Sequence, residues 1–223
     1  MSRGSAALTA ARKEEIIAAC AKLYETMSFK EITIKEIGAE TSFTRTSIYN
    51  YFETKEEIFL ALLQKEYELW VEAMEAVMVR ERALSRDQVA QALARTLTDR
   101  PRLLRLLSMN LYDMEAHSRP ERLTEFKRAF GASLKTVERM IQKYVPQMDA
   151  GARQRFLYAF FPFIYGIYPY TSVTDKQKAA MEEAGIPYAY QSAYGLTCAC
   201  LQKLLKESKE EAACNTQNWA HLI

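Results

Sequence analysis

Apolar residues recur at three- and four-residue spacing along nearly the whole chain, and this period limits the fold more than any other feature. Such spacing places the apolar side chains on one face of an α-helix, where they can pack against a core. The 223 residues include only 7 Gly and 6 Pro, so the chain is poor in the residues that tight β-turns need. We therefore predict an all-α fold with short loops.

Helix start and stop signals divide this pattern into separate helices. Thr33 with Glu36, and Thr54 with Glu57, have the spacing of a capping box. In that motif the hydroxyl accepts from the third helical amide, and the glutamate accepts from the amide of the capping residue. One helix should start at Thr33, and the others should cover residues 9–27, 44–51, 54–79, 85–98, 101–114, 120–144, 150–168, 176–184 and 187–206.

Two short helices separated by a brief turn lie within residues 33–51, which is the arrangement of a helix-turn-helix. The second of them would expose a row of hydrogen-bonding side chains, and a single helix of this size fits the DNA major groove. Gly38 has no Cβ and would let a neighbouring helix approach closely. The row consists of Thr44, Arg45, Thr46, Ser47, Tyr49 and Asn50.

The segment ITIKEIGAETSFTRTSIYNYFETKEEIFLALL resembles the DNA-binding signature of the tetracycline-repressor (TetR) family. The resemblance covers about residues 12–65, and SIYNYF followed by TKEEIF are its most specific words. Two positions depart from the family pattern. The usual Ala–Gly–Val turn is Thr41–Ser42–Phe43 here, and the frequent Gly of the recognition helix is Thr46.

The resemblance implies a role for each matching side chain. Arg45 and Thr46 would contact bases, and Thr33 would contact a phosphate at the start of its helix. Four other side chains would also hold phosphates: Ser47, Tyr49, Tyr51 and Lys55. Other roles stay open: Tyr51 and Phe52 can be core aromatics, Lys55 can be a solvated neighbour of the cap, and Arg45 can pair with Glu40.

The expected organisation is a helix-turn-helix domain over residues 1–53, a helical ligand-binding and dimerisation domain over 54–207, and a polar tail over 208–223. Residues 156–170 hold eight aromatic side chains, too many for one neighbouring helix to cover. Some of these rings must lie in the core, and others can line an apolar ligand pocket. The candidate pocket residues are Met109, Tyr112, Phe130, Phe160, Phe163 and Tyr165.

The last helix suits a dimer interface, because it mixes small residues such as Gly195 and Ala199 with leucines. Small residues allow close helix approach, so pairing with residues 150–168 of a second copy would build a four-helix interface. The resemblance implies the same surface. Alternatively, this face of the helix is buried within one subunit.

Asp113, Glu115 and His117 form a thin constellation for a metal or a catalytic site, since only two His occur in the chain. A solvated helix end before Pro120 is the plainer interpretation. No nucleophile elbow, P-loop or dinucleotide motif occurs in the sequence. We therefore expect neither a cofactor nor an enzyme.

Charge and cysteine content set further limits. The net charge is +2, and the first sixty residues hold eight Lys or Arg against nine Glu, so DNA contact must depend on a few placed donors. The four Cys form no CxxC pair, and the N-terminal residues lack the apolar stretch of a signal peptide. Residues 156–174 carry no charge, but two Pro and four Tyr make them a poor membrane span. These features favour the cytoplasm and no membrane association.

The expected function is a ligand-responsive, DNA-binding transcriptional regulator. The dimeric protein would repress from a palindromic operator and be released by a lipophilic or aromatic small molecule. Two alternatives remain open at this point. One is a DNA-binding regulator without an effector, and the other is a helical-bundle enzyme or metal-binding protein centred on Asp113, Glu115 and His117.

Overall fold

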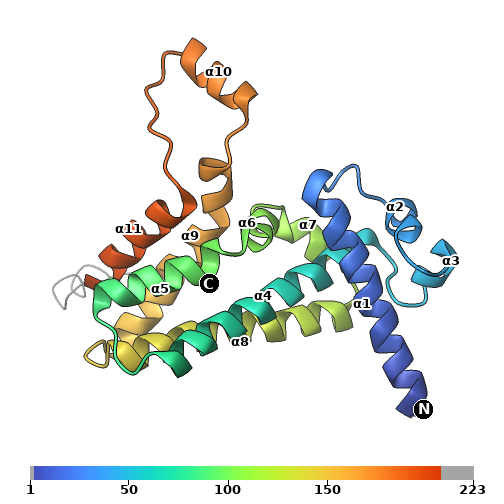
Figure 1. The fold of residues 1–223 in the computed structure, drawn as a ribbon, viewed down its shortest axis with the longest axis horizontal. Coiled ribbons are helices and arrows are strands. Elements are labelled where there is room, and N and C mark those ends of the chain that lie inside the picture. Colours follow the sequence, from blue (N-terminus) through green and yellow to red (C-terminus); the bar gives the residue numbers. More distant parts are fainter. Residues whose placement is uncertain (1–2, 207–223) are drawn as a thin grey trace, which may run out of the picture.

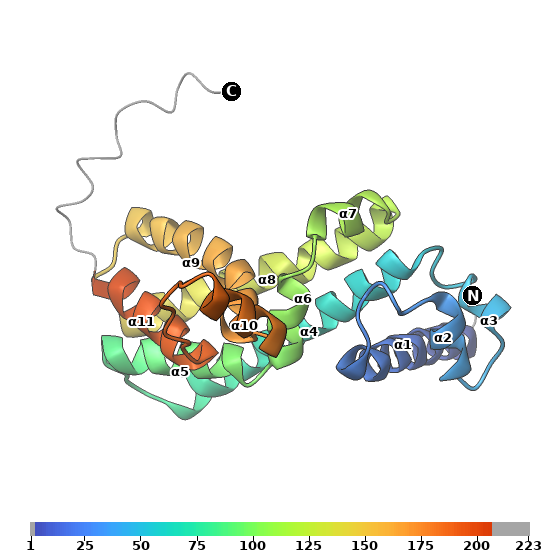
Figure 2. The ribbon, with the colours of Figure 1, turned by 90° about the horizontal axis from the view of Figure 1, so that it is seen from above.

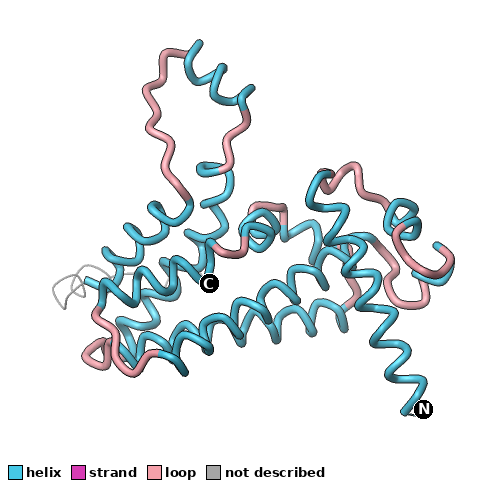
Figure 3. Tube along the Cα trace, in the orientation of Figure 1, coloured by secondary structure: helices cyan, strands magenta, loops and turns pink. Residues whose placement is uncertain are grey.

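The structure is a computed structural model that describes residues 3–206, with side chains from residue 6 onward. All described residues lie in helices or in the loops between them, which confirms the predicted all-α fold (Figure 3). The helices are α1 (Arg3–Thr26), α2 (Ile34–Ala39), α3 (Arg45–Ile48), α4 (Lys55–Arg80), α5 (Arg86–Thr98), α6 (Pro101–Leu107), α7 (Leu111–Ala116), α8 (Pro120–Tyr144), α9 (Ala150–Thr171), α10 (Asp175–Glu183) and α11 (Ala193–Lys206).

Helices α1, α2 and α3 form a small head at one end of the molecule, and α4 leads from it into the second domain (Figure 1). Helix α8 lies along α4 in both views of the ribbon (Figures 1 and 2). The two helices run parallel. Arg119, which precedes α8, bonds Glu57 near the start of α4, and Tyr144 at the end of α8 donates to the Glu81 carbonyl beyond the end of α4 (2.9 Å).

Helices α5, α9 and α11 pack together at the end of the second domain that lies far from the head, and α6 and α7 return towards the head. The segment 172–192, which contains α10, projects away from the rest of the chain (Figure 1). We call this segment the arm. No residue of α10 is buried.

An aromatic cluster forms the centre of the second domain. Trp70 from α4 lies 6.5 Å from Phe160 and 6.1 Å from Phe161, measured between ring centroids. Phe130 from α8 meets the Phe161 ring edge-on at 5.6 Å. Trp70 and Phe160 are completely buried, and fully burying a large apolar side chain stabilises a fold by about 1.5–3 kcal/mol. Helices α4, α8 and α9 are therefore held by one shared core.

Neither capping box predicted from the sequence forms completely. The Thr33 hydroxyl accepts from the amide of Lys35, the second helical residue (3.2 Å), instead of the third, and it donates to the Glu36 carboxylate. Thr54 accepts from the Glu57 amide as expected (3.1 Å), but the Glu57 carboxylate turns to the Glu53 amide and to Arg119. Complete capping boxes occur instead at Ser85 with Gln88 and at Thr174 with Gln177.

Four predicted helices differ clearly from the structure. The helix expected over 9–27 begins already at Arg3, and the helix expected over 44–51 comprises only Arg45–Ile48. The helix expected over 101–114 is divided into α6 and α7, because the Ser108 hydroxyl donates to the Arg105 carbonyl (2.7 Å) and the Asn110 side chain caps α7. The helix expected over 187–206 begins only at Ala193. There the Ser192 hydroxyl oxygen accepts from the Gly195 amide (3.0 Å) and defines the start.

The uncharged segment 156–174, which the sequence indicated to be a poor membrane span, lies mostly in helix α9 of the second domain. Phe156, Phe160 and Ile164 of α9 are buried in its core. Within residues 3–206 no helix combines the length and the apolar character that crossing a bilayer needs.

Candidate DNA-binding surface

Helix α3 is held against the rest of the head by buried apolar side chains. Ile48 of α3, Ile37 of α2 and Phe52 after α3 are at most 1% exposed. A Cβ added to Gly38 would lie 3.2 Å from both Cα and Cβ of Arg45, so the absence of a side chain there permits the close approach of α3. This contact confirms the expected role of Gly38, and it fixes which face of α3 points outward.

The outward face of α3 and its flanks carries side chains that can bind DNA. Thr44, Arg45, Thr46, Tyr49 and Asn50 are exposed. Ser47 is half-buried, and its hydroxyl pairs with that of Thr44 (3.0 Å). An arginine can donate two hydrogen bonds to a guanine edge, and hydroxyls and amides suit phosphate oxygens.

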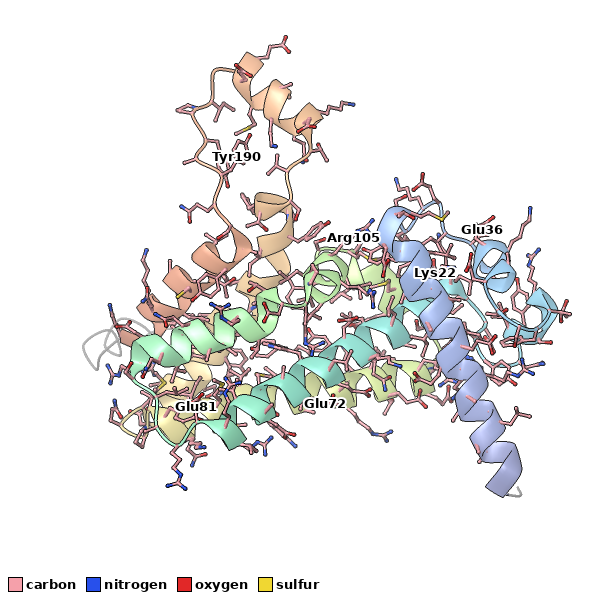
Figure 4. The ribbon with its side chains drawn as sticks, viewed as in Figure 1. Lys22, Glu36, Glu72, Glu81, Arg105 and Tyr190 are labelled. Carbon is pink, nitrogen blue, oxygen red and sulfur yellow. The ribbon has the colours of Figure 1, made fainter. Side chains whose placement is uncertain are left out.

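The alternative pairing of Arg45 with Glu40 does not occur. The Glu40 carboxylate is instead bound by the Lys22 ammonium of α1 (2.5 Å). Among the residues that the structure describes, no ion pair involves Arg45. Figure 4 labels Lys22 on α1 and Glu36 on α2.

Helix α1 holds the turn between α2 and α3, a role that the sequence did not suggest. The Glu15 carboxylate accepts from the Ser42 amide, and this hydrogen bond lowers the pKa of Glu15 below its ordinary value. The Arg12 guanidinium donates to the Ser42 hydroxyl (3.3 Å) and lies 4.3 Å above the centre of the Phe43 ring. The unusual Thr41–Ser42–Phe43 turn is thus fixed by side chains from outside it.

Three residues predicted to bind phosphate have other contacts in the head. The Lys55 ammonium donates to the carbonyls of Phe29 (2.8 Å) and Ile32 (3.2 Å), so it fastens the start of α4 to the α1–α2 loop. Tyr51 is half-buried, with its ring 6.4 Å from that of Phe43. Thr33 is exposed, but its hydroxyl already binds Glu36.

Two family models together match most of the chain. "Bacterial regulatory proteins, tetR family" matches residues 16–62, and "Tetracyclin repressor-like, C-terminal domain" matches residues 64–190. The chain belongs to the TetR family. It is a DNA-binding transcriptional regulator, since TetR-family regulators are transcription factors and not enzymes. No curated protein matches it.

Solved structures of TetR-family proteins share the fold. A putative TetR-family transcriptional regulator from Mesorhizobium loti MAFF303099 is 16% identical, with 92% of this chain and 98% of that chain covered and a TM-score of 0.57. The fatty acid degradation regulator FadR from Bacillus halodurans is 13% identical, with 88% and 96% covered and a TM-score of 0.57. A TetR/AcrR-family regulator from Thermobifida fusca YX-ER1 is 18% identical, with 89% and 98% covered and a TM-score of 0.56.

In this TetR-family chain, Arg119 at the start of α8 contacts both the start of α4 and the end of the head. The Arg119 guanidinium donates to both Glu57 carboxylate oxygens (2.7 Å each) and to the Tyr51 carbonyl (3.2 Å). Burial alone would raise the pKa of Glu57, but hydrogen bonds from Arg119 and from the Glu53 amide outweigh burial and hold the pKa below its ordinary value. Glu57 is 1% exposed, so its charge depends on these partners.

A second arginine connects the head to α6. The Arg105 guanidinium donates to the carbonyls of Tyr24 and Met27 (2.9 Å for Met27) at the end of α1, and it lies 4.0 Å above the centre of the Tyr24 ring. The end of α1 is therefore capped from the second domain, at the position labelled Arg105 in Figure 4. Movement of α6 would act directly on α1.

The structure does not bring the six predicted pocket residues together. Phe130 and Phe160 belong to the aromatic cluster, and the Tyr165 hydroxyl pairs with the Tyr67 hydroxyl beside it (3.1 Å). Tyr112 is 82% exposed, and Phe163 is partly buried against the core. Met109 is the member of this set that lines a cavity of about 530 Å³ between α7 and the head.

Asp113, Glu115 and His117 do not form a metal site. The Asp113 carboxylate accepts from the side-chain amide of Asn110 (2.7 Å), Glu115 pairs with Lys127 (2.6 Å), and the His117 ring bonds the Asp113 carbonyl (2.7 Å). Across residues 3–206, no three His, Cys, Asp or Glu side chains are grouped so that they could hold a metal ion. The three side chains thus belong to the α7 end, which supports the plainer interpretation.

Proposed function

We propose that the chain binds operator DNA as a dimer and that α3 of each subunit enters the major groove. The observation that carries this proposal is the exposed polar face of α3 above the buried Ile48 and Phe52. Arg45 and Thr46 contact bases. Thr33, Thr44, Ser47, Tyr49, Asn50 and Tyr51 contact phosphates, and Lys55 holds α4 in position through its two carbonyl contacts.

The proposed dimer forms through α9 and α11. Along α9, Ala159, Pro162 and Pro169 are exposed on one stripe, and a Cβ added to Gly166 on the same stripe would meet no atom within 4 Å. Gly195 and Ala199 of α11 are exposed, whereas its Leu201 and Leu205 are buried within the subunit. A two-fold axis through this surface would hold two α3 helices about 34–36 Å apart, one turn of DNA.

The proposed effector site is the cavity of about 530 Å³ beside Met109. Its volume falls within the range of about 300–1,000 Å³ that small-molecule sites occupy. Phe29, Met109 and Met114 line it with apolar surface, and polar or charged side chains complete the lining, which suits a small lipophilic molecule that carries a polar group. The polar and charged lining residues are Ser28, Lys30, Glu56, Asn110, Asp113 and His117.

A molecule in that cavity would contact the head through Phe29 and the second domain through Met109 and Met114. Its affinity would therefore depend on how far the head lies from the second domain. A ligand can shift a conformational equilibrium only if it binds the two states with different affinities. Coupling of about 1–3 kcal/mol would change operator affinity by about 5–150-fold. We propose that occupation releases the operator, so that the protein acts as a repressor.

A specific observation favours a second candidate, a regulator without a small-molecule effector. The rings of Trp70, Phe130, Phe160 and Phe161 pack against one another where a pocket was predicted. We would then expect no compound to change operator affinity. Filling the cavity with Met109→Trp separates the candidates, because only an effector-responsive protein would lose a response.

We also propose a cytoplasmic location, where operator DNA lies and thiols stay reduced. Cys20 is a buried thiol without a disulfide, and burial raises its pKa to about 12. A thiol in that environment is unreactive.

The deciding experiment is fluorescence anisotropy of the full chain with labelled DNA from upstream of its own gene, at low salt. We expect saturable binding that an unlabelled copy of the same DNA displaces better than random DNA. Equal displacement by both would contradict operator recognition, and no binding at low salt, where phosphate contacts are strongest, would contradict DNA binding through α3.

A further inference from the structure

The arm, residues 172–192, contains a helix with well-defined ends although it projects away from the rest of the subunit. Helix α10 has nine residues, and none is buried. A helix shorter than about 12–15 residues is marginal in water unless it packs against something. The arm nevertheless holds a complete capping box at Thr174 and Gln177, and Gly185 ends the helix with φ 66°. The described part of the subunit therefore buries no residue of this helix, although the sequence defines where the helix starts and ends.

The inner side of the arm is apolar. The side chains of Tyr170, Ile186, Tyr188 and Tyr190 are between 41% and 59% exposed, and the Tyr188 and Tyr190 rings meet edge-on at 5.0 Å. Figure 4 places Tyr190 on this inner side. A hollow of about 440 Å³ lies there, lined among others by Pro169, Tyr170, Val173, Met181, Ile186 and Tyr190. Contiguous exposed apolar surface of this kind marks a site of association.

The hollow continues the exposed stripe of α9. Pro169 is the last member of that stripe, and both Pro169 and the exposed Tyr170 that follows it line the hollow. The arm leaves the body at the end of α9 and returns to it at the start of α11, the two helices of the proposed dimer surface. Another protein chain that covers the α9 stripe would therefore contact the arm as well.

We propose that the arm embraces a second copy of this chain, with the hollow at Met181, Ile186 and Tyr190 closing over apolar side chains of the other subunit. This inference rests on the proposed dimer. Two-fold symmetry makes the contact reciprocal, so that each subunit contributes one arm and receives one. The charged residues of α10 that do not line the hollow, among them Lys176 and Glu183, remain in water.

The first test compares amide hydrogen exchange of residues 172–192 in three full-length proteins. Gly166→Arg places a long charged side chain on the α9 stripe without meeting its own subunit, and should give a monomer. Gly131→Arg on α8 is the matched control, because a Cβ there also meets no atom within 4 Å. We expect slow exchange in the wild type and the control, and exchange at least about tenfold faster in a Gly166→Arg monomer. Equally slow exchange in that monomer would overturn the proposal.

The second test changes the arm itself. Met181→Asp with Ile186→Asp should raise the dimer dissociation constant at least about tenfold in sedimentation equilibrium, because charged groups would enter the contact. The control Lys176→Ala with Glu183→Ala should leave it unchanged. If the dimer dissociation constant of the aspartate variant is unchanged, the proposed arm contact is wrong, although the proposed dimer is not contradicted.

The two tests also separate the arm from the α9 surface. A Gly166→Arg protein that stays dimeric, together with an aspartate variant that dissociates, would support the arm and remove the α9 stripe from the interface. A wild-type chain that is monomeric at all concentrations would remove both proposals.

Discussion

The head and the second domain use their characteristic side chains in opposite ways. In the head, Arg45, Thr46 and Asn50 are exposed, on a helix fastened from beneath by Ile48. In the core of the second domain, large aromatic side chains are buried and paired: the Trp70 indole donates to the Thr96 hydroxyl (3.2 Å), and the Tyr67 hydroxyl pairs with that of Tyr165. The head exposes the polar side chains that can bind a partner, whereas the core of the second domain buries its aromatic side chains.

This difference predicts which property each part controls. Removing an exposed side chain of α3 takes away a contact with a partner and leaves the fold intact. Removing a ring from the aromatic cluster takes away internal packing. The contacts of Arg105 and Arg119 lie between these extremes, because they join the parts. Substitutions on the exposed face of α3, in the aromatic cluster and at the arginine contacts therefore test whether the head and the second domain differ in this way.

The largest effect on folding is expected from Phe160→Ala. Phe160 is fully buried between Phe156, Phe161 and Trp70. Its loss should lower the free energy of unfolding by about 3–5 kcal/mol, measured by denaturant titration. Tyr112→Ala is the control, since Tyr112 is 82% exposed and its loss should change stability by less than about 0.5 kcal/mol. Equal effects would mean that the rings do not form a core.

Glu57→Gln tests the joint between the parts. We expect a loss of about 2–3 kcal/mol, less than for a fully buried pair, because Arg119 keeps 36% of its side chain exposed. The pKa of the Glu57 carboxyl is lowered in the fold, so its contribution to stability is present above its unfolded pKa of about 4.3 and is lost as pH falls through the folded value.

The wild type and Glu57→Gln should therefore converge in stability on acidification below that range, as followed by thermal melting against pH. Glu53→Gln is the control, because its carboxylate contacts the same arginine (3.2 Å) but is 60% exposed. A constant difference between the wild type and Glu57→Gln at every pH would contradict the charge-based account.

Arg45→Ala tests the exposed side of the contrast. Losing a bidentate base contact should weaken operator binding by about 1–3 kcal/mol per half-site. Unfolding free energy should stay within about 0.5 kcal/mol of the wild type. Anisotropy titrations and denaturant titrations measure the two quantities. Arg82→Ala, also exposed but beyond the far end of α4, should change neither.

Lys55→Met distinguishes a positioning role from a phosphate contact. Losing the hydrogen bonds to the Phe29 and Ile32 carbonyls should cost about 1–2 kcal/mol of stability. The slope of operator affinity against salt concentration should not change. A slope smaller by about one per subunit would instead assign Lys55 to a phosphate.

Much of the head could be predicted because its determinants are close in sequence. The spacing of Ile37, Gly38 and Ile48 specifies two packed helices, and SIYNYF indicates the family. The supports from α1 could not be predicted. The Glu15 carboxylate meets the Ser42 amide, and the Arg12 guanidinium meets the Phe43 ring, only after folding brings together segments about thirty residues apart.

In the second domain the sequence predicted helices but not their contacts. The 120–144 helix agrees with α8 because Pro120 and Pro146 bound a regular apolar stripe. The pocket residues could not be grouped, because ring-to-ring contacts such as Phe130 with Phe161 depend on how α8 and α9 cross. The Glu57 cap was likewise altered by Arg119, a residue 62 positions away.

The smallest effect is expected from Tyr165→Phe. The hydroxyls of Tyr67 and Tyr165 lie 3.1 Å apart beside the aromatic cluster, and burial raises the pKa of both. A double-mutant cycle with Tyr67→Phe should give a coupling free energy of about 0.5–1.5 kcal/mol, and Tyr112→Phe should leave stability unchanged. A coupling free energy near zero would mean that the two hydroxyls form their hydrogen bonds with water instead of with each other. The cluster would then have room for solvent, and a ligand site among Phe130, Phe160 and Tyr165 would become the better proposal than the cavity beside Met109.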